Sequence, residues 1–517
     1  MRILVINLTR FGDLLQTQPV ISGLKAQGHE VGLMCLENFA PAVELMRDVD
    51  HTFSFPGAAL LARLDDDWRE SLSLFWQWGG DELRSFAPHR VLNLTATLPG
   101  RLLSSFAASE VQGFGIDDFG FAVNSSPWAA FLQVSSRNRG CSPYNLVDQF
   151  WRVSGLCDGD RSYRLAKPAE GAKAQMRDRL QSESHEKSQG YVALQLGASD
   201  DRRRWPIGHF AALAERIWQE HGLIPVLLGT KIEAPLGQRF AQEISCPHID
   251  LIGATTLVEL AAVLTEMRLL VTNDTGTMHL AAGLGTPVCA VFLVTAQPWD
   301  TGPYAPGCLC VEADLACHPC GFRHRCQINH ACRSTVTAEA LYHYIQQFIV
   351  TGRWEAGASI PAGIRVWATA VQPDGAMGLE SLSGHDIQDR TSWVRLQRHF
   401  YRQFLDEQEP TPPHEVYPLS DEMTQSASRV LEQAGQLLFL MGEQVSVLAR
   451  TPVPMLRNKF LGNFERVTAL LADDYLFSVL GDMWRQESQS MARDFTMLSA
   501  LIKRYSALVE VWRQCLS

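Results

Sequence analysis

Apolar positions near the start of the chain form short uninterrupted runs, and segments with helical periodicity separate these runs. Residues 2–8 are almost entirely aliphatic, and similar runs occur at 30–36 and 90–97. A strand that is buried on both faces has this pattern, because neither face needs polar side chains. Helical patterns at 14–25 and 68–85 lie between the runs. The alternation predicts a parallel, doubly wound α/β sheet.

A second alternation follows a polar segment at 165–190, which we expect to contain a helix and an interdomain linker. Its strand-like runs are 191–196, 225–229, 269–273 and 288–292, and its helical patterns are 208–220, 236–245, 256–267 and 277–284. Two such units in tandem predict two Rossmann-like domains, at 1–165 and 190–350. They would face a cleft, because ligands of these sheets bind beyond the carboxyl ends of the strands.

The pattern changes after residue 350. Residues 352–390 are rich in Gly, Ser and Pro, which predicts a linker with a short hairpin at 364–382 and a turn at Pro373-Asp-Gly375. From 391 to 517, apolar residues recur every three or four positions, which predicts a helical domain. We expect this domain to form a homo-oligomer or to dock a partner. A solvated extra domain without a partner is the alternative.

Composition and charge exclude several classes of protein. The chain has 517 residues, of which 46% are hydrophobic and 20% charged, so disordered and low-complexity classes do not apply. A net charge of -11 argues against a dedicated nucleic-acid binder. No run of about 20 apolar residues occurs, and the first apolar run is too short for a signal peptide. We therefore expect a cytoplasmic protein.

The turn after the first apolar run contains Gly12 and Asp13. Gly12 would allow a backbone or a ligand to approach closely. Asp13 has two interpretations. It is either a residue that caps the start of a helix or a general base at the edge of a cleft.

The stretch Asn273-Asp-Thr-Gly-Thr-Met-His279 follows another strand and leads into a helix. The amides of residues 276–278 at this helix start would suit an anion such as a diphosphate. Asp274 would hold the turn, and His279 lies in the first helical turn. The alternative is a capped helix with a structural histidine.

Two further segments contain candidate chemistry. Residues 197–206 include three consecutive arginines, and one of them could reach a phosphate, although such runs are usually solvated.

Six of the twelve cysteines lie between 308 and 332. The spacing of Cys317, Cys320, Cys326 and Cys332 suits a closed tetrahedral site for structural zinc or iron. Reduced structural thiols and disulfides are the alternatives.

Taken together, these stretches resemble glycosyltransferase family nine, the ADP-heptose:lipopolysaccharide heptosyltransferases, over about residues 1–350. The matching stretches are Ile3-Leu-Val-Ile-Asn-Leu-Thr-Arg-Phe-Gly-Asp13, Ser199 to Pro206, Leu251-Ile-Gly-Ala-Thr-Thr-Leu-Val-Glu-Leu260, and Asn273-Asp-Thr-Gly-Thr-Met-His-Leu-Ala-Ala282. Their order and spacing carry the resemblance. It implies a GT-B fold, inverting sugar transfer and no catalytic metal.

The resemblance also implies roles for individual residues. Asp13 matches the family's proposed base, with Gly12 and Arg10 on the acceptor side. Arg203 stands where the family usually has Lys, and with the amides of residues 276–278 it would stabilise the departing ADP. The donor-contacting positions would be Ser199, Glu233, Asp274, Thr275, Gly276, Thr277, Met278 and His279. Asn7 replaces the Arg of many members. Cysteine runs occur in many members, and a related protein heptosyltransferase subgroup binds iron through them.

The expected function is therefore transfer of heptose from ADP-heptose to lipopolysaccharide core, in peripheral contact with the inner membrane face. A protein acceptor is the second hypothesis. A non-catalytic relative that serves as an assembly or binding module is the third. A nucleotide-dependent dehydrogenase is disfavoured, because the first loop lacks Gly-x-Gly-x-x-Gly.

Overall fold

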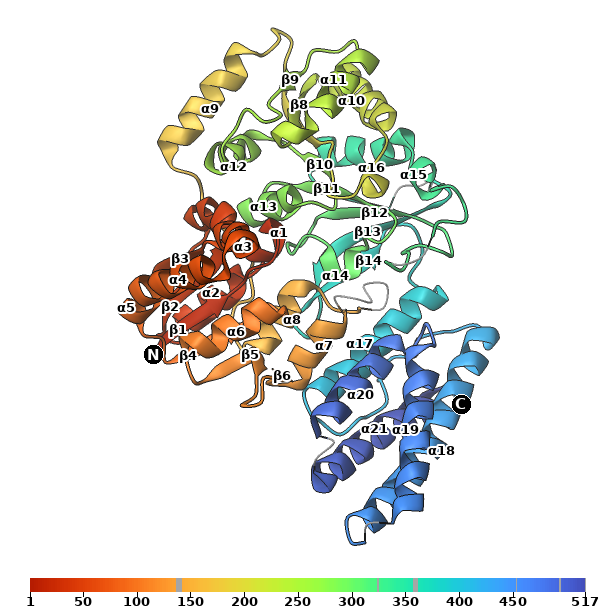
Figure 1. The fold of residues 1–517 in the computed structure, drawn as a ribbon. Helices are drawn as coiled ribbons and strands as arrows, with labels where there is room; N and C mark the ends of the chain where they lie inside the picture. The colour runs from red at the N-terminus through yellow and green to blue at the C-terminus, as the bar shows by residue number, and fades with distance from the viewer. Residues whose placement is uncertain (136–141, 323–324, 357–360, 452, 492–493, 517) are drawn as a thin grey trace. The chain divides into compact units, whose positions relative to one another are not determined.

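The computed structural model describes residues 1–517 except 136–141, 323–324, 357–360, 452, 492–493 and 517 (Figure 1). The chain forms two compact units. The first contains Met1–Ala122 and Tyr144–Ser383, and the second contains Val123–Pro143 and Gly384–Ser517. Both predicted sheets lie in the first unit. Within the described part of the chain, no helix has the length and apolar character to cross a membrane.

The first sheet has its strands in the order β3-β2-β1-β4-β5-β6, and β1 to β5 pair in parallel. Its strands are β1 (Arg2–Ile6), β2 (Glu30–Leu36), β3 (His51–Phe55), β4 (Arg90–Asn93) and β5 (Val111–Ile116), and β6 (Ala122–Asn124) follows them in sequence. The four residues from Ile3 to Ile6 are at most 1% exposed, which explains why all four are aliphatic.

The helical segments of the first sheet are shorter than the sequence pattern suggests. They are α1 (Phe11–Leu15), α2 (Gln18–Ala26), η1 (Glu37–Leu45), α3 (Gly57–Asp66), α4 (Trp68–Trp78), η2 (Gly79–Leu83), α5 (Arg84–Phe86) and α6 (Leu98–Ala107). The helix predicted at 14–25 is divided because Pro19 stands at the start of α2, where its missing N–H costs nothing. Asp67 starts α4, because its side chain accepts a hydrogen bond from the amide of Arg69 at 2.9 Å.

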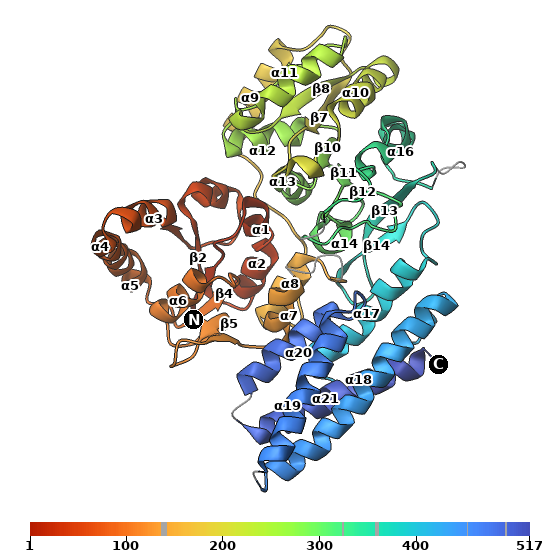
Figure 2. The same ribbon diagram turned by 45° about the vertical axis from the view of Figure 1, so that its right-hand side comes forward.

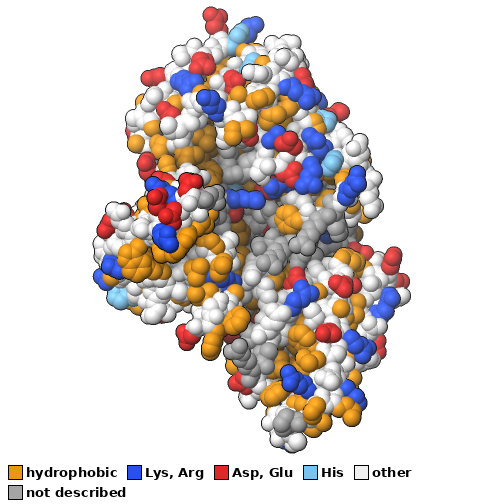
Figure 3. All heavy atoms as spheres, in the orientation of Figure 1, with side chains coloured by type: hydrophobic (Ala, Val, Ile, Leu, Met, Phe, Trp, Pro, Cys, Tyr) orange, Lys and Arg blue, Asp and Glu red, His pale blue; other side chains and the backbone are white. Residues whose placement is uncertain are grey.

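Helices α3 and α4 carry large apolar side chains that remain exposed. These are Leu61, Leu64, Trp68, Leu72 and Trp76. The space-filling view shows apolar side chains gathered over this part of the surface (Figure 3). We call these five residues the apolar patch.

The second sheet has eight strands in the order β14-β13-β12-β11-β10-β7-β8-β9. The parallel strands are β7 (Gly190–Gln195), β8 (Leu223–Leu228), β9 (Ile249–Asp250), β10 (Leu270–Asn273), β11 (Val288–Phe292) and β12 (Leu309–Ala313). Strands β13 (Ile364–Val371) and β14 (Met377–Ser381) are antiparallel. This hairpin lies in the segment predicted as linker and hairpin, and it extends the sheet because Ile364, Val366 and Trp367 are buried in it.

Helices cover both faces of the second sheet, as Figures 1 and 2 show. They are α9 (Glu170–Ser182), η4 (Asp201–Arg203), α10 (Ile207–His221), η5 (Lys231–Glu233), α11 (Ala234–Glu243), α12 (Leu257–Glu266), α13 (Gly276–Leu284), α14 (Pro298–Thr301), α15 (Cys332–Thr335) and α16 (Ala338–Thr351). Helix α8 (Leu146–Val153) instead packs against α2 of the first sheet. Two parallel-dominated sheets with flanking helices confirm the predicted α/β class with Rossmann-like parts.

The second unit is helical. It contains α7 (Pro127–Ser135), α17 (Asp389–Leu405), α18 (Asp421–Leu448), α19 (Pro454–Ala472), α20 (Ser478–Met491) and α21 (Phe495–Cys515). The predicted helical region is therefore present. However, α7 lies in the sequence assigned to the first domain, 1–165, and it belongs to this unit because Trp128 and Phe131 are buried within it.

Candidate functional site

The side chain of Asn7 binds the backbone of the turn that carries Asp13. The Asn7 side chain is 1% exposed. Its Nδ2 donates to the carbonyl oxygen of Asp13 at 3.1 Å and to Oγ1 of Thr17 at 2.8 Å. Its Oδ1 accepts from the amide of Thr9 at 3.2 Å. Asn7, which replaces the Arg of many family members, therefore binds the backbone of Asp13.

Helix α1 packs against the start of α13 with almost no space between them. A β-carbon on Gly12 would lie 2.8 Å from Cδ2 of His279 and 3.3 Å from Cα of Gly276. A β-carbon on Gly276 would lie 2.4 Å from Cδ1 of Phe11. The amide nitrogen of the buried Gln16 side chain lies 3.4 Å from Nε2 of His279. Two glycines thus let the Asp13 turn meet the Asp274 segment directly.

Three of the predicted donor-side residues form one polar cluster. Arg203 donates from Nη1 to Oδ2 of Asp274 at 3.1 Å and from Nη2 to Oγ of Ser199 at 2.7 Å. The side chains of Arg203 and Asp274 are 8% and 9% exposed. Asp200 starts the short helix η4 that presents Arg203, by accepting from the amide of Arg202 at 2.9 Å. A guanidinium held in this way presents a fixed positive charge at the end of the sheet.

The start of α13 is arranged by side chains from neighbouring strands. Thr277 donates from Oγ1 to Oε1 of Gln195 at 3.1 Å, and Thr275 lies with its Oγ1 3.1 Å from that of Thr272. The amide of Met278 donates to the carbonyl oxygen of Thr275 at 3.1 Å. The main-chain amides left to stabilise an anion would therefore be those of Gly276 and Thr277. The Met278 amide, which was also predicted to do so, is occupied by this hydrogen bond.

Glu233 lies over the carboxyl ends of β7 and β8. Its Oε1 occupies the space that a side chain at Gly197 would need, since a β-carbon there would lie 1.4 Å away. Its Oε2 accepts from the amide of Thr230 at 2.7 Å. The carboxylate is therefore fixed beside the loop that carries Ser199. Arg10, by contrast, is an exposed residue at the start of α1.

Sequence reasoning missed the residue that joins the two donor-side loops. Asn273 is wholly buried, and its Oδ1 accepts from the amide of Trp205 at 2.8 Å. Its Nδ2 donates to the carbonyl oxygens of Gly197 at 3.0 Å and Leu196 at 3.1 Å. The signal in the sequence was an amide residue at the last position of an apolar strand, directly before Asp274.

Comparison with known proteins identifies part of the chain. The sequence model described as Glycosyltransferase family 9 (heptosyltransferase) matches residues 154–331. Residues 154–331 therefore resemble this family. The identification agrees with the family that the sequence motifs indicated.

The curated relatives match only part of their own length. Lipooligosaccharide heptosyltransferase 2 of Haemophilus influenzae is 33% identical over 101 residues, which cover 19% of this chain and 29% of that protein. Lipopolysaccharide heptosyltransferase 1 of Pseudomonas aeruginosa is 28% identical over 143 residues, which cover 28% of this chain and 39% of that protein. The chain thus spans less than half the length of these two relatives.

A solved structure shows the shared fold. The structure of Escherichia coli ADP-heptose LPS heptosyltransferase II superposes with a TM-score of 0.51 at 18% identity, over 68% of this chain and 99% of that chain. Because the alignment covers 68% of this chain, the likeness in fold extends beyond residues 154–331. The predicted GT-B fold is confirmed.

The cysteine segment, residues 317–332, lies at the end of the stretch that matches the family model. Burial, followed by the neighbouring thiols of Cys317, Cys332 and Cys326, raises the pKa of Cys320 to about 11. The four predicted ligands are therefore neighbours. Among the described side chains, however, no three His, Cys, Asp or Glu residues are arranged so that they could hold a metal ion. In the described part of the chain, the four cysteines therefore do not form the predicted tetrahedral site.

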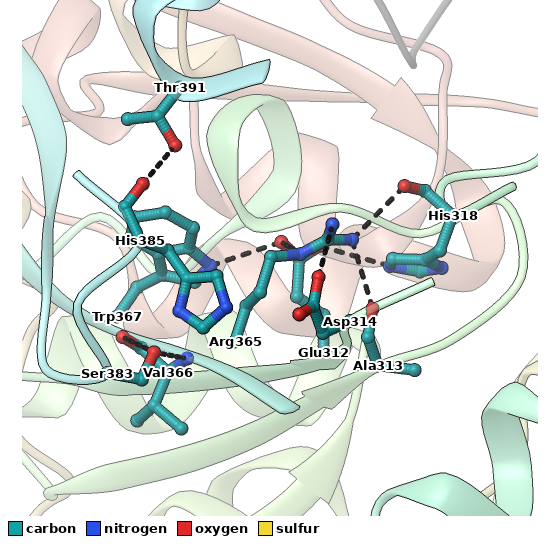
Figure 4. A network of polar contacts seen from close by, with 10 residues as sticks. All are labelled: Glu312, Ala313, Asp314, His318, Arg365, Val366, Trp367, Ser383, His385 and Thr391. Atoms are coloured by element: carbon teal, nitrogen blue, oxygen red, sulfur yellow. Dashed lines mark hydrogen bonds and ion pairs between the residues drawn. The ribbon is translucent and has the colours of Figure 1, made fainter. Parts of the chain in front are cut away.

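A buried polar network anchors this segment on the second sheet (Figure 4). Glu312 on β12 is wholly buried. Its Oε1 accepts from Nε of Arg365 at 3.0 Å and from Nε1 of Trp367 at 3.1 Å, and its Oε2 lies 3.0 Å from Nε2 of His318. Arg365 also donates to the carbonyl oxygen of His318 at 3.1 Å. His318 stands between Cys317 and Cys320, so the network fixes where the cysteine segment begins.

Proposed function

We propose that this chain is an inverting glycosyltransferase that moves heptose from ADP-heptose to an acceptor hydroxyl of lipopolysaccharide core, without a catalytic metal. The match of residues 154–331 to family 9 and the heptosyltransferase relatives support the reaction class. The observation that carries the proposal is the buried cluster of Arg203, Asp274 and Ser199 at the start of α13. A fixed cation beside a helix start is suited to a diphosphate leaving group.

On the donor side, the leaving group is ADP. As the bond between the anomeric carbon and the phosphate oxygen breaks, its electron pair stays on that oxygen, and negative charge grows there. Arg203 and the amides of Gly276 and Thr277 would stabilise this charge, and they act without reorganisation because their positions are already set. Glu233 would hold the ribose, since its carboxylate lies beside the same loop.

On the acceptor side, Asp13 would act as the general base. It takes the proton of the acceptor hydroxyl while that oxygen forms the new bond to the anomeric carbon. Attack from the face opposite to ADP inverts the configuration. The contact of Gly12 with His279 and Gly276 supports this arrangement, because it brings the Asp13 turn to the donor-side helix.

The test is a transfer assay with purified full-length protein, ADP-heptose and lipopolysaccharide core acceptors, with release of ADP as the measurement. Asp13→Asn keeps the size of the side chain but removes the base, so we expect at least a hundredfold lower kcat with nearly unchanged affinity for ADP. Asp117→Asn, at an exposed turn, is the control. An Asp13→Asn variant as active as wild type would refute the base assignment.

The same assay separates the alternative functions. Transfer to a protein substrate and not to lipopolysaccharide core would favour a protein heptosyltransferase. Absence of ADP binding by calorimetry would favour a non-catalytic relative. The proposal places the enzyme in the cytoplasm, in peripheral contact with the inner membrane that holds a lipid acceptor.

The apolar patch on α3 and α4 supports this membrane contact. Trp and Leu side chains on a helix surface are suited to the boundary between lipid headgroups and acyl chains. We expect Trp68→Ala combined with Trp76→Ala to reduce co-sedimentation with phospholipid vesicles. Equal sedimentation of variant and wild type would show that the apolar patch does not bind the membrane.

The cysteine segment is proposed to hold structural iron or zinc once its four thiols rearrange around the ion. Metal analysis of the purified protein is the direct measurement, and Cys320→Ser is the matched variant. Unchanged metal content in the variant, or no metal in wild type, would leave reduced thiols as the interpretation.

We also propose that the helical unit forms a homo-oligomer. Helix α18 exposes Phe439 and Leu440 beside a groove of about 280 Å³ that Leu431, Gly435 and Arg513 help to line. Light scattering of full-length protein measures its mass in solution. We expect Phe439→Asp to yield a smaller species, and an unchanged mass would exclude this face.

A further inference from the structure

The last residue of β10, Asn273, contacts both ends of the loop that presents Ser199 and Arg203. Its side-chain amide donates to the carbonyl oxygens of Leu196 and Gly197, where the loop begins. Its Oδ1 accepts from the amide of Trp205, where the loop ends. All of these contacts are at 2.8–3.1 Å, and the side chain is wholly buried.

The next residue in the chain completes the connection. Asp274 pairs with Arg203 at 3.1 Å, so the middle of the loop is attached to the residue that follows Asn273. Three points of one loop are therefore held by two consecutive residues at the end of one strand. A shift of this strand end relative to the loop would break the pairing of Arg203 and open the cluster.

We propose that Asn273 is a positioning residue that keeps Ser199 and Arg203 aligned with the start of α13. Its effect on donor binding rests on the proposed function, whereas its effect on the loop does not. The alternative is that Asn273 only adds stability to the fold. Trp205 has a second anchor, because its Nε1 donates to the carbonyl oxygen of Val336 at 2.6 Å. The loop could therefore stay attached to the domain and yet lose its alignment.

Two variants separate these interpretations. Asn273→Ala removes all of these side-chain hydrogen bonds. Asn273→Asp keeps the acceptor for the amide of Trp205 but points a carboxylate oxygen at two carbonyl oxygens, which repels the start of the loop. Asn93→Ala is the matched control. Asn93 is also wholly buried and also ends a strand, β4 of the first sheet, where its Nδ2 donates to the carbonyl oxygen of Phe114 at 2.6 Å.

The first measurement is amide hydrogen exchange in the full-length protein without ligand. We expect faster exchange at residues 197–205 in both Asn273 variants, and no change there in Asn93→Ala. Unchanged exchange at 197–205 in the Asn273 variants would overturn the proposal. This readout is independent of whether the chain binds a nucleotide.

The second measurement is ADP affinity by calorimetry at a temperature where all variants are folded. We expect Asn273→Asp to weaken ADP binding by about tenfold or more, and Asn93→Ala to leave it unchanged. Because Asn273 acts through Arg203, the double variant with Arg203→Ala should bind within about twofold of Arg203→Ala alone. Independent losses that multiply would overturn the coupling. A wild-type protein that does not bind ADP would overturn the proposed function, and the exchange result would still decide the position of the loop.

Discussion

Asn7 is the residue on which the backbone of Asp13 depends most directly. Its side-chain amide reaches the carbonyl oxygen of Asp13 and the hydroxyl of Thr17 from a buried position. A catalytic carboxylate must be placed within a fraction of an ångström to act on a hydroxyl, and a displacement of about 1 Å can cost a hundredfold in rate. In the proposed function, Asn7 therefore supports the base through the backbone of Asp13.

Replacing Asn7 with Ala should separate turnover from donor binding. We expect kcat to fall by about tenfold to a hundredfold, because the Asp13 turn loses its main support. ADP affinity should stay within about twofold of wild type, since the donor-side contacts are not altered. Steady-state kinetics and calorimetry measure the two effects. Equal losses in both quantities would indicate general damage to the fold instead.

Gly197 and Glu233 form a second residue pair whose geometry can be tested. A side chain at Gly197 cannot coexist with the present position of the Glu233 carboxylate. If Glu233 binds the ribose, Gly197→Ala should weaken ADP binding by about tenfold to a hundredfold, the usual value of a hydrogen bond to a charged group.

The control for this prediction is the combination of Gly197→Ala with Glu233→Ala. Removing the carboxylate makes space for the new methyl group, so the double variant should bind ADP about as well as Glu233→Ala alone. A further loss in the double variant would mean that Gly197 acts through some other contact. Isothermal titration of the three variants decides between these outcomes.

At the scale of elements, the cysteine segment is tied to the loop that carries Arg203. Arg333 at the end of the segment donates from Nε to the carbonyl oxygen of Arg204 at 2.9 Å. The amide of Cys320 donates to the carbonyl oxygen of Val294 at 2.7 Å, and Val294 has the unusual φ of 59° for a β-branched residue. The segment thus packs between β11 and the donor-side loop.

The network around Glu312 should contribute substantially to the stability of the second sheet. Glu312→Gln removes the buried negative charge that faces Arg365 and His318, while Arg365 retains its 3.4 Å pairing with the partly exposed Asp314. We expect the free energy of unfolding to fall by about 3–5 kcal/mol. Urea denaturation measures it, and Glu380→Gln on the exposed edge of β14 is the control. A loss no larger than that of the control would show that the network is not stabilising.

The sequence pattern predicted elements whose environment is uniform along their length. The first aliphatic run is a strand because both of its faces are buried, and the stripe from Met423 to Leu448 is the buried side of α18. The division of the first helix required attention to Pro19, and α3 was not predicted. That the β13–β14 hairpin joins the second sheet could not be predicted, because strand pairing depends on residues distant in sequence.

In the candidate site, too, some residues could be predicted from the sequence and others could not. Asp13, Arg203 and Asp274 were found because their residue types match the chemistry and lie in a recognisable order. Asn7 and Asn273 were not assigned a role, because a buried amide at a strand end is equally compatible with a purely structural role. Only the hydrogen bonds of the folded chain show which backbone atoms each amide holds.

At the scale of the whole molecule, the helical unit is assembled from two distant parts of the chain. Helix α7 contributes Trp128, which is 5% exposed and donates from Nε1 to Oδ1 of Asp406 at 2.8 Å. Phe131 packs edge-on against Tyr401 with ring centroids 5.8 Å apart. The helices after residue 384 therefore cannot be removed without uncovering apolar side chains of α7. A truncation at 352 would also delete the β13–β14 hairpin.

This organisation predicts a local effect of Trp128→Ala. Loss of a buried Trp costs about 3–5 kcal/mol, and here the loss falls on the helical unit. We expect faster amide exchange in α17 and α20 but unchanged exchange in β1 to β5, because those strands belong to the other compact unit. Trp76→Ala, at an exposed position on α4, is the matched control and should leave α17 and α20 unchanged. A uniform increase across both units would mean that the chain unfolds as one cooperative body and that α7 has no special role in the helical part.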